Sequence, residues 1–576
     1  MRFFTSKAKT ADVSPPPSKQ EPDMEVQHVD AIHVDALQGR KEKELALEED
    51  HLPGFSHVEA SAVDEIYQRK VYIMNKIMNE HIGMTWWQYG LLLVSGVGWF
   101  LDNAWLQLVA VILTSAYKEF HPEDESSRNT AFLNTALYMG LIFGAAFWGY
   151  AADIVGRRFS FNATLLICGV FGVAAGGAKS FVALGSLLAC TGFGIGGSLP
   201  VDGMLFLEFL PGARQQLLTL LSVFWPLGQL VTSLIAWGFI PKWTCHDTNC
   251  YEFNGSGWRT HNVGWRYVLF TTGAYTLLCF IARFFIFRIP ESPKFLISKG
   301  RDADAVVAMH KLAQMCGKPL PEGMLTVATL RSAAGQDVDM TEVTMEETMK
   351  PSMIGRLQFM YKDFITNVTT SHSHNPFGHL KPLFSSWALG YTTAVIWALW
   401  ALIGLAYPLF NSFILLYLGG DSKPENRVYR DYVIVSVCGI PGSLLAAWLV
   451  DLPRSGRRGA MAFGTLLTGV FLFGFTGAGG SSDSQLAFSS VVSFTQNIMY
   501  GVLFCYTPET FPAPLRGAAD GVGSSLNRLF GLFASIIYIY GGDNASAPIY
   551  VSASLFIVCA LLMLTLRVET AARTAL

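Results

Sequence analysis

Charged residues are scarce in this sequence. Asp, Glu, Lys and Arg make up 15% of its 576 residues, against about 25% in an ordinary soluble domain. The formal net charge is only −3, which gives no reason to expect a nucleic acid as a partner. Walker motifs, a His-Glu-x-x-His zinc motif and a cysteine-rich set of metal ligands are also missing. We therefore expect no cofactor and no resident metal, and neither an ATP-driven pump nor a membrane enzyme.

A secretory signal peptide is absent as well. The first 85 residues are polar and mixed in charge, and the first long apolar run begins near Trp86. We therefore expect a cytosolic amino terminus. Residues 1–60 are rich in proline and acidic groups and predict a disordered tail, while the spacing of apolar residues over 61–85 predicts an amphipathic helix along the inner membrane face.

Hydrophobic residues are abundant, at 51% of the chain. A helix needs about twenty apolar residues to cross the hydrocarbon core of a bilayer. The first six runs that meet this length are 86–117, 131–150, 160–178, 181–207, 217–239 and 267–287. The other six are 383–418, 431–450, 459–478, 485–508, 518–540 and 547–566. We predict an all-α membrane protein with bundles at 86–287 and 383–567, a central cytosolic loop at 288–382 and a cytosolic tail at 568–576.

The basic residues of the short loops predict the orientation. If the amino terminus is cytosolic, the loops that carry arginine after spans 2, 4, 8 and 10 are cytosolic too, as is usual for Lys and Arg. The same parity places Cys245, Cys250, Asn254 and Asn544 outside. We expect a disulfide between the two cysteines and glycans on the two asparagines, which begin Asn-x-Ser sequons. Both termini are then cytosolic, with the plasma membrane as the default location and a vacuolar or vesicle membrane as the alternative.

Two loop patterns occur twice. The stretch from Asp153 to Arg158, after span 2, has a counterpart from Asp451 to Arg458 after span 8. The stretch from Glu208 to Arg214, after span 4, has a counterpart from Glu509 to Arg516 after span 10. Two matched pairs in equivalent loops indicate a duplicated unit of six helices.

These motifs carry a resemblance to a known family. Gly149-Tyr-Ala-Ala-Asp-Ile-Val-Gly-Arg-Arg158 and Pro290-Glu-Ser-Pro-Lys294 resemble loop signatures of the major facilitator superfamily, in the group of sugar porters and synaptic-vesicle-glycoprotein-related transporters of the fungal type. The resemblance implies two pseudo-symmetric six-helix bundles, alternating access, a central site for a small solute, and a monomer that works in the lipid bilayer. Leu188 stands where many members have an arginine, which counts against proton coupling through that arginine. Span 7 lacks the paired glutamines of sugar porters, which counts against a hexose as the substrate.

Few charges lie within the predicted spans. Asp102, Asp202 and Arg528 are near mid-span, where a charge is costly and usually serves a function, while Arg283 is close enough to the inner interface to snorkel. No histidine lies in a span, so Asp102 and Asp202 are the candidates for binding and releasing a proton. The alternative is a static ion pair, for instance between Asp102 and Arg528, that locks helices together.

The repeated loops supply candidates for an inner gate. In the superfamily, charged clusters at such helix ends are thought to hold the inner side closed, and simple anchoring of the topology is the alternative. The gate candidates in this chain are Asp153, Gly156, Arg157, Arg158, Glu208, Arg214, Asp451, Arg457, Arg458, Glu509 and Arg516.

Polar and aromatic residues near mid-span are the pool for substrate binding. Gln229 is the best single candidate, because it stands where sugar porters have a substrate-binding glutamine. The other candidates are Arg528, Asn527, Tyr391, Gln496 and Asn497, with Trp400 and Tyr500 in the wider pool. Pro226 and Pro408 predict bends. We expect proton-coupled secondary transport of a sugar, organic acid, organic ion or other metabolite, in either direction. The alternative is a receptor-like member that binds a solute and signals through the central loop.

Overall fold

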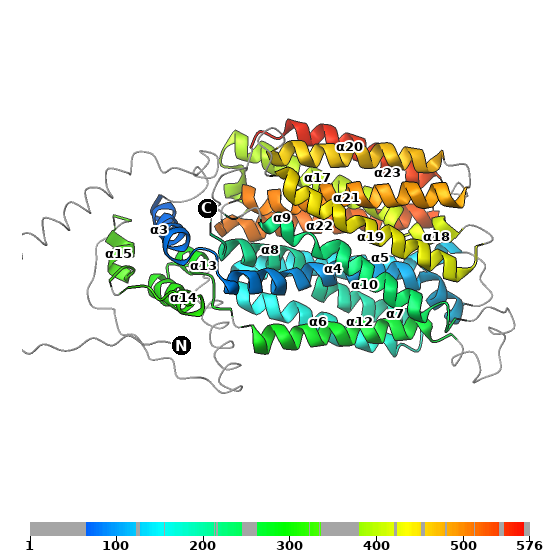
Figure 1. The fold of residues 1–576 in the computed structure, drawn as a ribbon, viewed down its shortest axis with the longest axis horizontal. Helices are drawn as coiled ribbons and strands as arrows, with labels where there is room; N and C mark the ends of the chain where they lie inside the picture. Colours follow the sequence, from blue (N-terminus) through cyan, green and yellow to red (C-terminus); the bar gives the residue numbers. More distant parts are fainter. Residues whose placement is uncertain are drawn as a thin grey trace, which may run out of the picture. The chain divides into compact units, whose positions relative to one another are not determined.

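The computed structural model has helices and no strands among the residues that it describes (Figure 1). These residues are 65–121, 127–154, 156–211, 214, 217–244, 262–287, 289–321, 323–332, 334–335, 380–419, 423–450, 456–477, 481–511, 513–540 and 546–568. The predicted tail 1–60, the disulfide partners Cys245 and Cys250, the sequons at Asn254 and Asn544, and Asp451 all lie outside them.

Twelve helices in the described part of the chain are long and apolar enough to span a membrane. In the first half they are α4 (Trp86–Phe120), α5 (Ala131–Ile154), α6 (Arg157–Gly176), α7 (Phe181–Ile195) with α8 (Ser198–Glu208), α9 (Leu217–Leu221) with α10 (Phe224–Phe239), and α12 (Gly264–Ile281) with a π-helical end, η5 (Ala282–Ile286). In the second half they are α17 (Trp387–Asn411) with α18 (Ile414–Gly419), α19 (Glu425–Val450), α20 (Gly456–Thr476), α21 (Ser482–Thr510), α22 (Ala513–Tyr540) and α23 (Ala547–Thr565). Both predicted sets of six are confirmed, although helices such as α19 continue into polar residues beyond the apolar run.

The packing of the helices repeats between the halves. In the first half α4 packs on α10, α5 on α7, and α6 on both α7 and α12. The equivalent pairs of the second half are α17 with α22, α19 with α21, and α20 with both α21 and α23. Contacts between the halves follow the same symmetry, because α5 packs along α22 and α10 along α19. The duplicated unit inferred from the loops is therefore visible in the helix packing.

Glycine allows the closest of these helix contacts. A Cβ atom on Gly192 would lie 2.5 Å from the carbonyl oxygen of Leu137, and one on Gly194 would lie 2.5 Å from the backbone nitrogen of Cys168. Between the halves, a Cβ on Gly149 of α5 would lie 2.7 Å from the Cα of Gly521 on α22. Small residues let membrane helices approach at backbone distance, so any side chain at these positions would force the helices apart.

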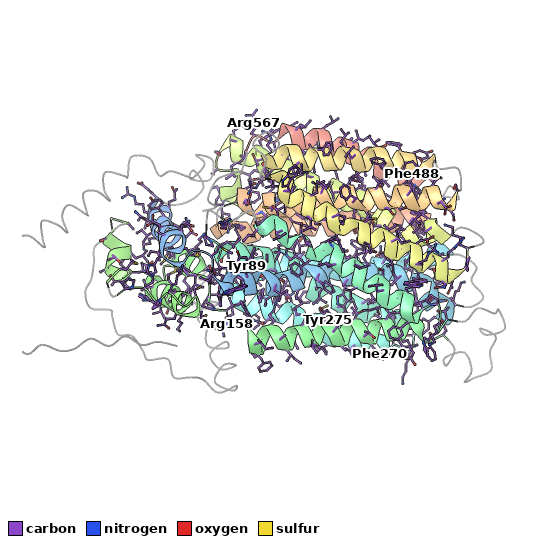
Figure 2. The ribbon with its side chains drawn as sticks, in the orientation of Figure 1. Tyr89, Arg158, Phe270, Tyr275, Phe488 and Arg567 are labelled. Carbon is purple, nitrogen blue, oxygen red and sulfur yellow. The ribbon has the colours of Figure 1, made fainter. Side chains whose placement is uncertain are left out.

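Large apolar side chains face outward from the spans. Leu278, Phe270 and Tyr275 of α12 are 63%, 39% and 40% exposed, and Figure 2 shows Phe270 at the outer edge of the bundle. Such a surface is costly in water and suits the hydrocarbon of a bilayer.

The expected inner-surface helix and central loop form one small helical cluster. It consists of α3 (Glu65–Ile77), α13 (Pro293–Ser298), α14 (Asp302–Met315) and α15 (Val327–Ser332), which lie together beyond one end of the spans (Figure 1). α3 packs its apolar side chains on α13 and α15, and Lys70 Nζ donates to Asp302 Oδ2 at 2.7 Å. The apolar residues Tyr67, Val71 and Met74 of α3 are therefore covered by protein, and its position along the inner membrane face stays a prediction. We call the side of the spans that carries this cluster the α13 end.

Candidate functional site

A small cavity lies between the two halves at the middle of the spans. Its volume is about 10 Å³, which is room for about one water molecule. The first half contributes Tyr138, Leu199 and Trp225, and the second half contributes the remaining lining residues: Trp400, Gly404, Tyr407, Pro408, Tyr500, Phe504, Ser524, Asn527 and Arg528. The halves also touch on either side of it: Tyr429 donates to the carbonyl of Val111, and Ser443 donates to that of Ser222. The structure therefore shows a closed conformation around a nearly filled central site.

Half of the residues that line this cavity are aromatic. Phe504 is their centre, with ring centroids 5.3 Å from Trp225, 5.3 Å from Trp400 and 5.2 Å from Tyr500. Tyr407 meets Tyr500 edge to face at 5.2 Å. Rings at these distances attract each other and present apolar faces to a ligand. A planar apolar ligand would replace ring contacts that the closed conformation makes with itself.

Arg528 is the only Lys or Arg among the residues that line the cavity. Its Nη2 atom donates to both oxygens of Asp102, at 3.1 and 2.9 Å, and joins α22 of the second half to α4 of the first. Asp102 is fully buried and lies behind the guanidinium, outside the cavity lining. Within the described part of the chain, the buried Nε atom of Arg528 has no hydrogen-bond partner. The cavity is therefore faced by a cation whose donors are only partly used.

Asp202 makes a second buried ion pair, but inside one half. Arg283 Nη2 donates to Asp202 Oδ2 at 2.7 Å, and the same guanidinium donates to the carbonyl oxygens of Phe161 and Val94. Its carbon also lies 3.3 Å from the centroid of the Phe161 ring. Arg283 is 3% exposed, so the expectation that it snorkels to the interface is wrong. Asp202 satisfies its charge within the first half, away from the cavity.

A polar network extends from the cavity towards the end of the spans that lies opposite the α13 end. Gln107 of α4 donates to the hydroxyl of Tyr407 at 3.0 Å and accepts from the hydroxyl of Tyr432 at 2.5 Å, both in the second half. Asn103 donates to the carbonyl of Trp225 at 2.8 Å, where α9 gives way to α10. The bonds of Gln107 connect the two halves, and the bond of Asn103 holds the break between α9 and α10 of the first half beside the cavity.

The predicted substrate residues divide into two groups. Asn527 and Arg528 line the cavity, and Asn527 also donates to the carbonyl of Trp400 at 3.0 Å. The others are not among its lining residues. Gln229 is buried in α10, Gln496 accepts from Asn411, and Asn497 donates to the carbonyl of its own helix at Ser493. Tyr391 lies near the start of α17 under the guanidinium of Arg567.

The sequence reasoning missed seven lining residues, of which four are aromatic: Tyr138, Trp225, Tyr407 and Phe504. Two of them had a usable signal, because Trp225 and Tyr407 directly precede the prolines at 226 and 408. A proline inside a membrane helix leaves a backbone acceptor unpaired, so bends collect where a cavity or neighbouring group can compensate. The other two stand among many aromatic residues of the spans, and nothing in the sequence separates them.

Towards the α13 end, the repeated loops form matching ion pairs. Arg157 at the start of α6 pairs with Glu208 at the end of α8 at 3.3 Å, and Arg457 at the start of α20 pairs with Glu509 at the end of α21 at 2.9 Å. Each pair lies within one half. Gly156 has φ 114°, a conformation that favours glycine, just before Arg157.

The remaining gate candidates differ in their surroundings. Arg516 donates to the carbonyl oxygens of Pro508 and Phe511 and lies close enough to Glu208 to interact with its charge. The backbone nitrogen of Arg158 donates to the carboxylate of Glu291. Arg214 is exposed, and the side chain of Asp153 lies outside the described residues. The structure thus brings together Arg157 with Glu208 and Arg457 with Glu509, and it does not bring Arg214 to either pair.

Comparisons with known proteins agree on the family. Residues 89–535 match the model of the Major Facilitator Superfamily. The chain is 41% identical over 526 residues to "MFS siderochrome iron transporter 1" of Ceriporiopsis subvermispora, which covers 90% of this chain and 94% of that protein. It is 37% identical to "Major facilitator-type transporter hxnZ" of Emericella nidulans, covering 90% of each. Among solved structures, the proton:xylose symporter XylE with 6-bromo-6-deoxy-D-glucose bound has a similar fold, with a TM-score of 0.61 at 16% identity over 85% of this chain and 97% of that one. The chain belongs to the Major Facilitator Superfamily and is a multi-pass membrane transporter of small solutes.

Proposed function

We propose that this protein is a proton-coupled secondary transporter that moves a small organic solute by alternating access at the central cavity. The single observation that carries this proposal is the ion pair between Asp102 and Arg528. This buried pair joins the two halves beside the cavity, and it cannot keep its 2.9 Å geometry when the halves separate.

Asp102 is the proposed proton carrier. A buried carboxylate is stable in the charged form while a cation lies beside it, and it takes up a proton when that cation is withdrawn or shared with an anion. Separation of the halves changes the distance between Asp102 and Arg528 and opens the cavity to water. The side chain can therefore bind a proton on one side of the membrane and release it on the other. Asp202 keeps a partner from its own half and is given no part in this step.

Alternating access is supported by the symmetric contacts between the halves. The α5–α22 and α10–α19 contacts are equivalent by the internal repeat, so rocking of one half against the other exchanges one open side for the other. The pairs of Arg157 with Glu208 and Arg457 with Glu509 are proposed to keep the helix ends of each half together during that movement. A cytosolic α13 end follows from the arginines in these loops.

The names of the similar proteins mention different solutes. "Siderochrome iron" is in the name of the Ceriporiopsis relative, and a proton and xylose are in that of the structural neighbour. Small organic solutes are the common class, and the lining of this cavity suits such a solute.

Uptake into proteoliposomes tests the proposal. The purified full chain is reconstituted, a small-molecule extract is supplied outside, and the contents are compared by mass spectrometry with and without an inward proton gradient. We expect at least one organic solute to accumulate only with the gradient. Asp102→Asn should abolish accumulation while leaving exchange at equal concentrations, whereas Asp304→Asn, at an exposed carboxylate of α14, should behave as the wild type. Gradient-driven accumulation by Asp102→Asn would disprove the coupling role.

A further inference from the structure

We infer that the substrate is a small planar aromatic anion, with its carboxylate on Arg528 and its ring among the aromatic side chains around Phe504. This inference rests on the proposed function, because it assigns the solute class of the same central site. It is drawn from the charge, the unused donors and the ring faces of the cavity.

The sign of the ligand's charge follows from which partner of the ion pair faces the cavity. Arg528 lines the cavity, and Asp102 lies behind it. A cationic ligand would meet the guanidinium first and be repelled, whereas an anion would be attracted. Arg528 is the one charged side chain among the lining residues of this cavity, and the nearest carboxylate of an adjoining cavity, Asp520, lies beyond the shared residues Trp400, Phe504 and Ser524.

The guanidinium also has donors left for such an anion. Asp102 uses one nitrogen, Nη2, for both of its oxygens, and the buried Nε has no partner within the described residues. A buried donor without a partner is costly, and a guanidinium presents its donors as a planar fork that matches a carboxylate. A bound carboxylate would satisfy Nε while Asp102 stays on Nη2.

The shape of the ligand follows from the rings. Phe504 packs against the rings of Trp225, Trp400 and Tyr500 at distances typical of aromatic pairs. Tyr407 packs in turn on Tyr500. Their faces and edges suit a flat ring better than a puckered one, because aromatic pairs gain energy beyond buried area. Ser524 and Asn527 add two small polar side chains beside Arg528, which suits a ligand with one charged end and one ring.

Charge balance then links this ligand to the proton. The empty site is neutral, with one cation and one carboxylate. Adding an anion leaves a net charge of −1 in a site closed from water, which is strongly unfavourable. A proton taken from water on the entry side and held on Asp102 restores neutrality, and it leaves with the anion on the other side. The transported pair is one anion with one proton, and no net charge crosses the membrane.

Four matched probes test the ligand class with the purified full chain. These are benzoate, benzamide without the charge, cyclohexanecarboxylate without the aromatic ring, and phenyltrimethylammonium with the opposite charge. We expect benzoate to bind, with benzamide weaker by about tenfold or more because a bond to a charged group is lost. Cyclohexanecarboxylate should be weaker by about two- to tenfold because ring packing is lost. Phenyltrimethylammonium should not compete with benzoate.

Two variants place the probes in the site. Arg528→Gln should remove the preference for benzoate over benzamide, and Phe504→Leu should reduce the preference for benzoate over cyclohexanecarboxylate while keeping folding and the charge preference. Arg430→Gln, a half-exposed arginine beside Asp431 outside the cavity, is the matched control and should keep both preferences. If Arg528→Gln does not fold, the wild-type series and Phe504→Leu still decide the question.

The outcomes separate this inference from the proposed function. Equal binding of benzoate and benzamide, or tight binding of the ammonium probe, overturns the inference. If a proton gradient nevertheless drives another solute into proteoliposomes, the proposed function stands. Selective benzoate binding without flux in either direction supports the assigned ligand class and overturns the transport proposal in favour of a receptor-like protein.

Discussion

Two buried ion pairs of the same chemistry differ in what they connect. Asp202 and Arg283 belong to α8 and η5 of the first half, and the arginine is further held by two carbonyl oxygens and the ring of Phe161. Asp102 and Arg528 belong to opposite halves, and the arginine lines the cavity between them.

What a buried ion pair connects distinguishes a structural charge from a functional one. A pair within a half survives the relative movement of the halves, so it contributes to the stability of every conformation. A pair across the halves contributes only while they are closed, so its energy enters the equilibrium between conformations. Burial alone does not distinguish them, because the two aspartates are both fully buried.

The largest expected effect is on stability, at the pair within the first half. Asp202→Asn leaves the Arg283 guanidinium buried without a counter-charge, which should lower the free energy of unfolding by about 3–5 kcal/mol. The thermal midpoint of the purified protein measures this. Asp304→Asn is the exposed control and should change stability by no more than about 0.5 kcal/mol. A variant Asp202→Asn with wild-type stability but no transport would contradict the structural role.

A smaller and differently placed effect is expected at the pair across the halves. Asp102→Asn removes a charged acceptor worth about 1.5–3 kcal/mol to the closed conformation, while water that enters from the cavity can hydrate Arg528. Hydrogen exchange should therefore become faster at the α5–α22 interface, with little change in α12.

The two variants should speed hydrogen exchange in different helices. Asp202→Asn is expected to speed hydrogen exchange in α6 and α12, next to Phe161 and Arg283, more than at the α5–α22 interface. If both variants loosen the same helices, the distinction between a pair within a half and a pair across the halves fails.

The sequence was informative where the determinant is local. The length of an apolar run decides whether a helix can span a bilayer, and the repeated loops around Arg157 and Arg457 revealed the duplication. The cost of a charge in a membrane points to Asp102 and Arg528, and the structure pairs the two side chains. The helices α13–α15 were missed because short polar helices depend on tertiary contacts rather than on an apolar run.

The cavity wall was harder to predict because it depends on the depth at which each side chain lies along its helix and on how that helix is rotated about its axis. Gln229 was chosen by its position in the sequence, yet it is Trp225, one helical turn earlier, that lines the cavity. Tyr391 and Trp400 stand on the same helix, and only the second reaches the centre. That rotation is set by packing against distant segments, such as α5 on α22, which no local pattern reports.

The smallest expected effect extends the comparison to a buried charge outside the spans. Burial and the neighbouring Arg516 lower the pKa of Lys294 on α13 to about 7, while Glu208 opposes this shift. An exposed lysine in the unfolded chain titrates near 10.4. Below pH 7 both states carry the proton, and the full cost of burying the cation is present. Between pH 7 and 10 the unfolded chain binds more protons, so stability should rise with pH.

Lys294→Met, which removes the charge, should therefore raise the thermal midpoint more at pH 6 than at pH 9. Equal gains at the two pH values would show that Lys294, like Arg283, keeps its charge in the folded protein through a partner.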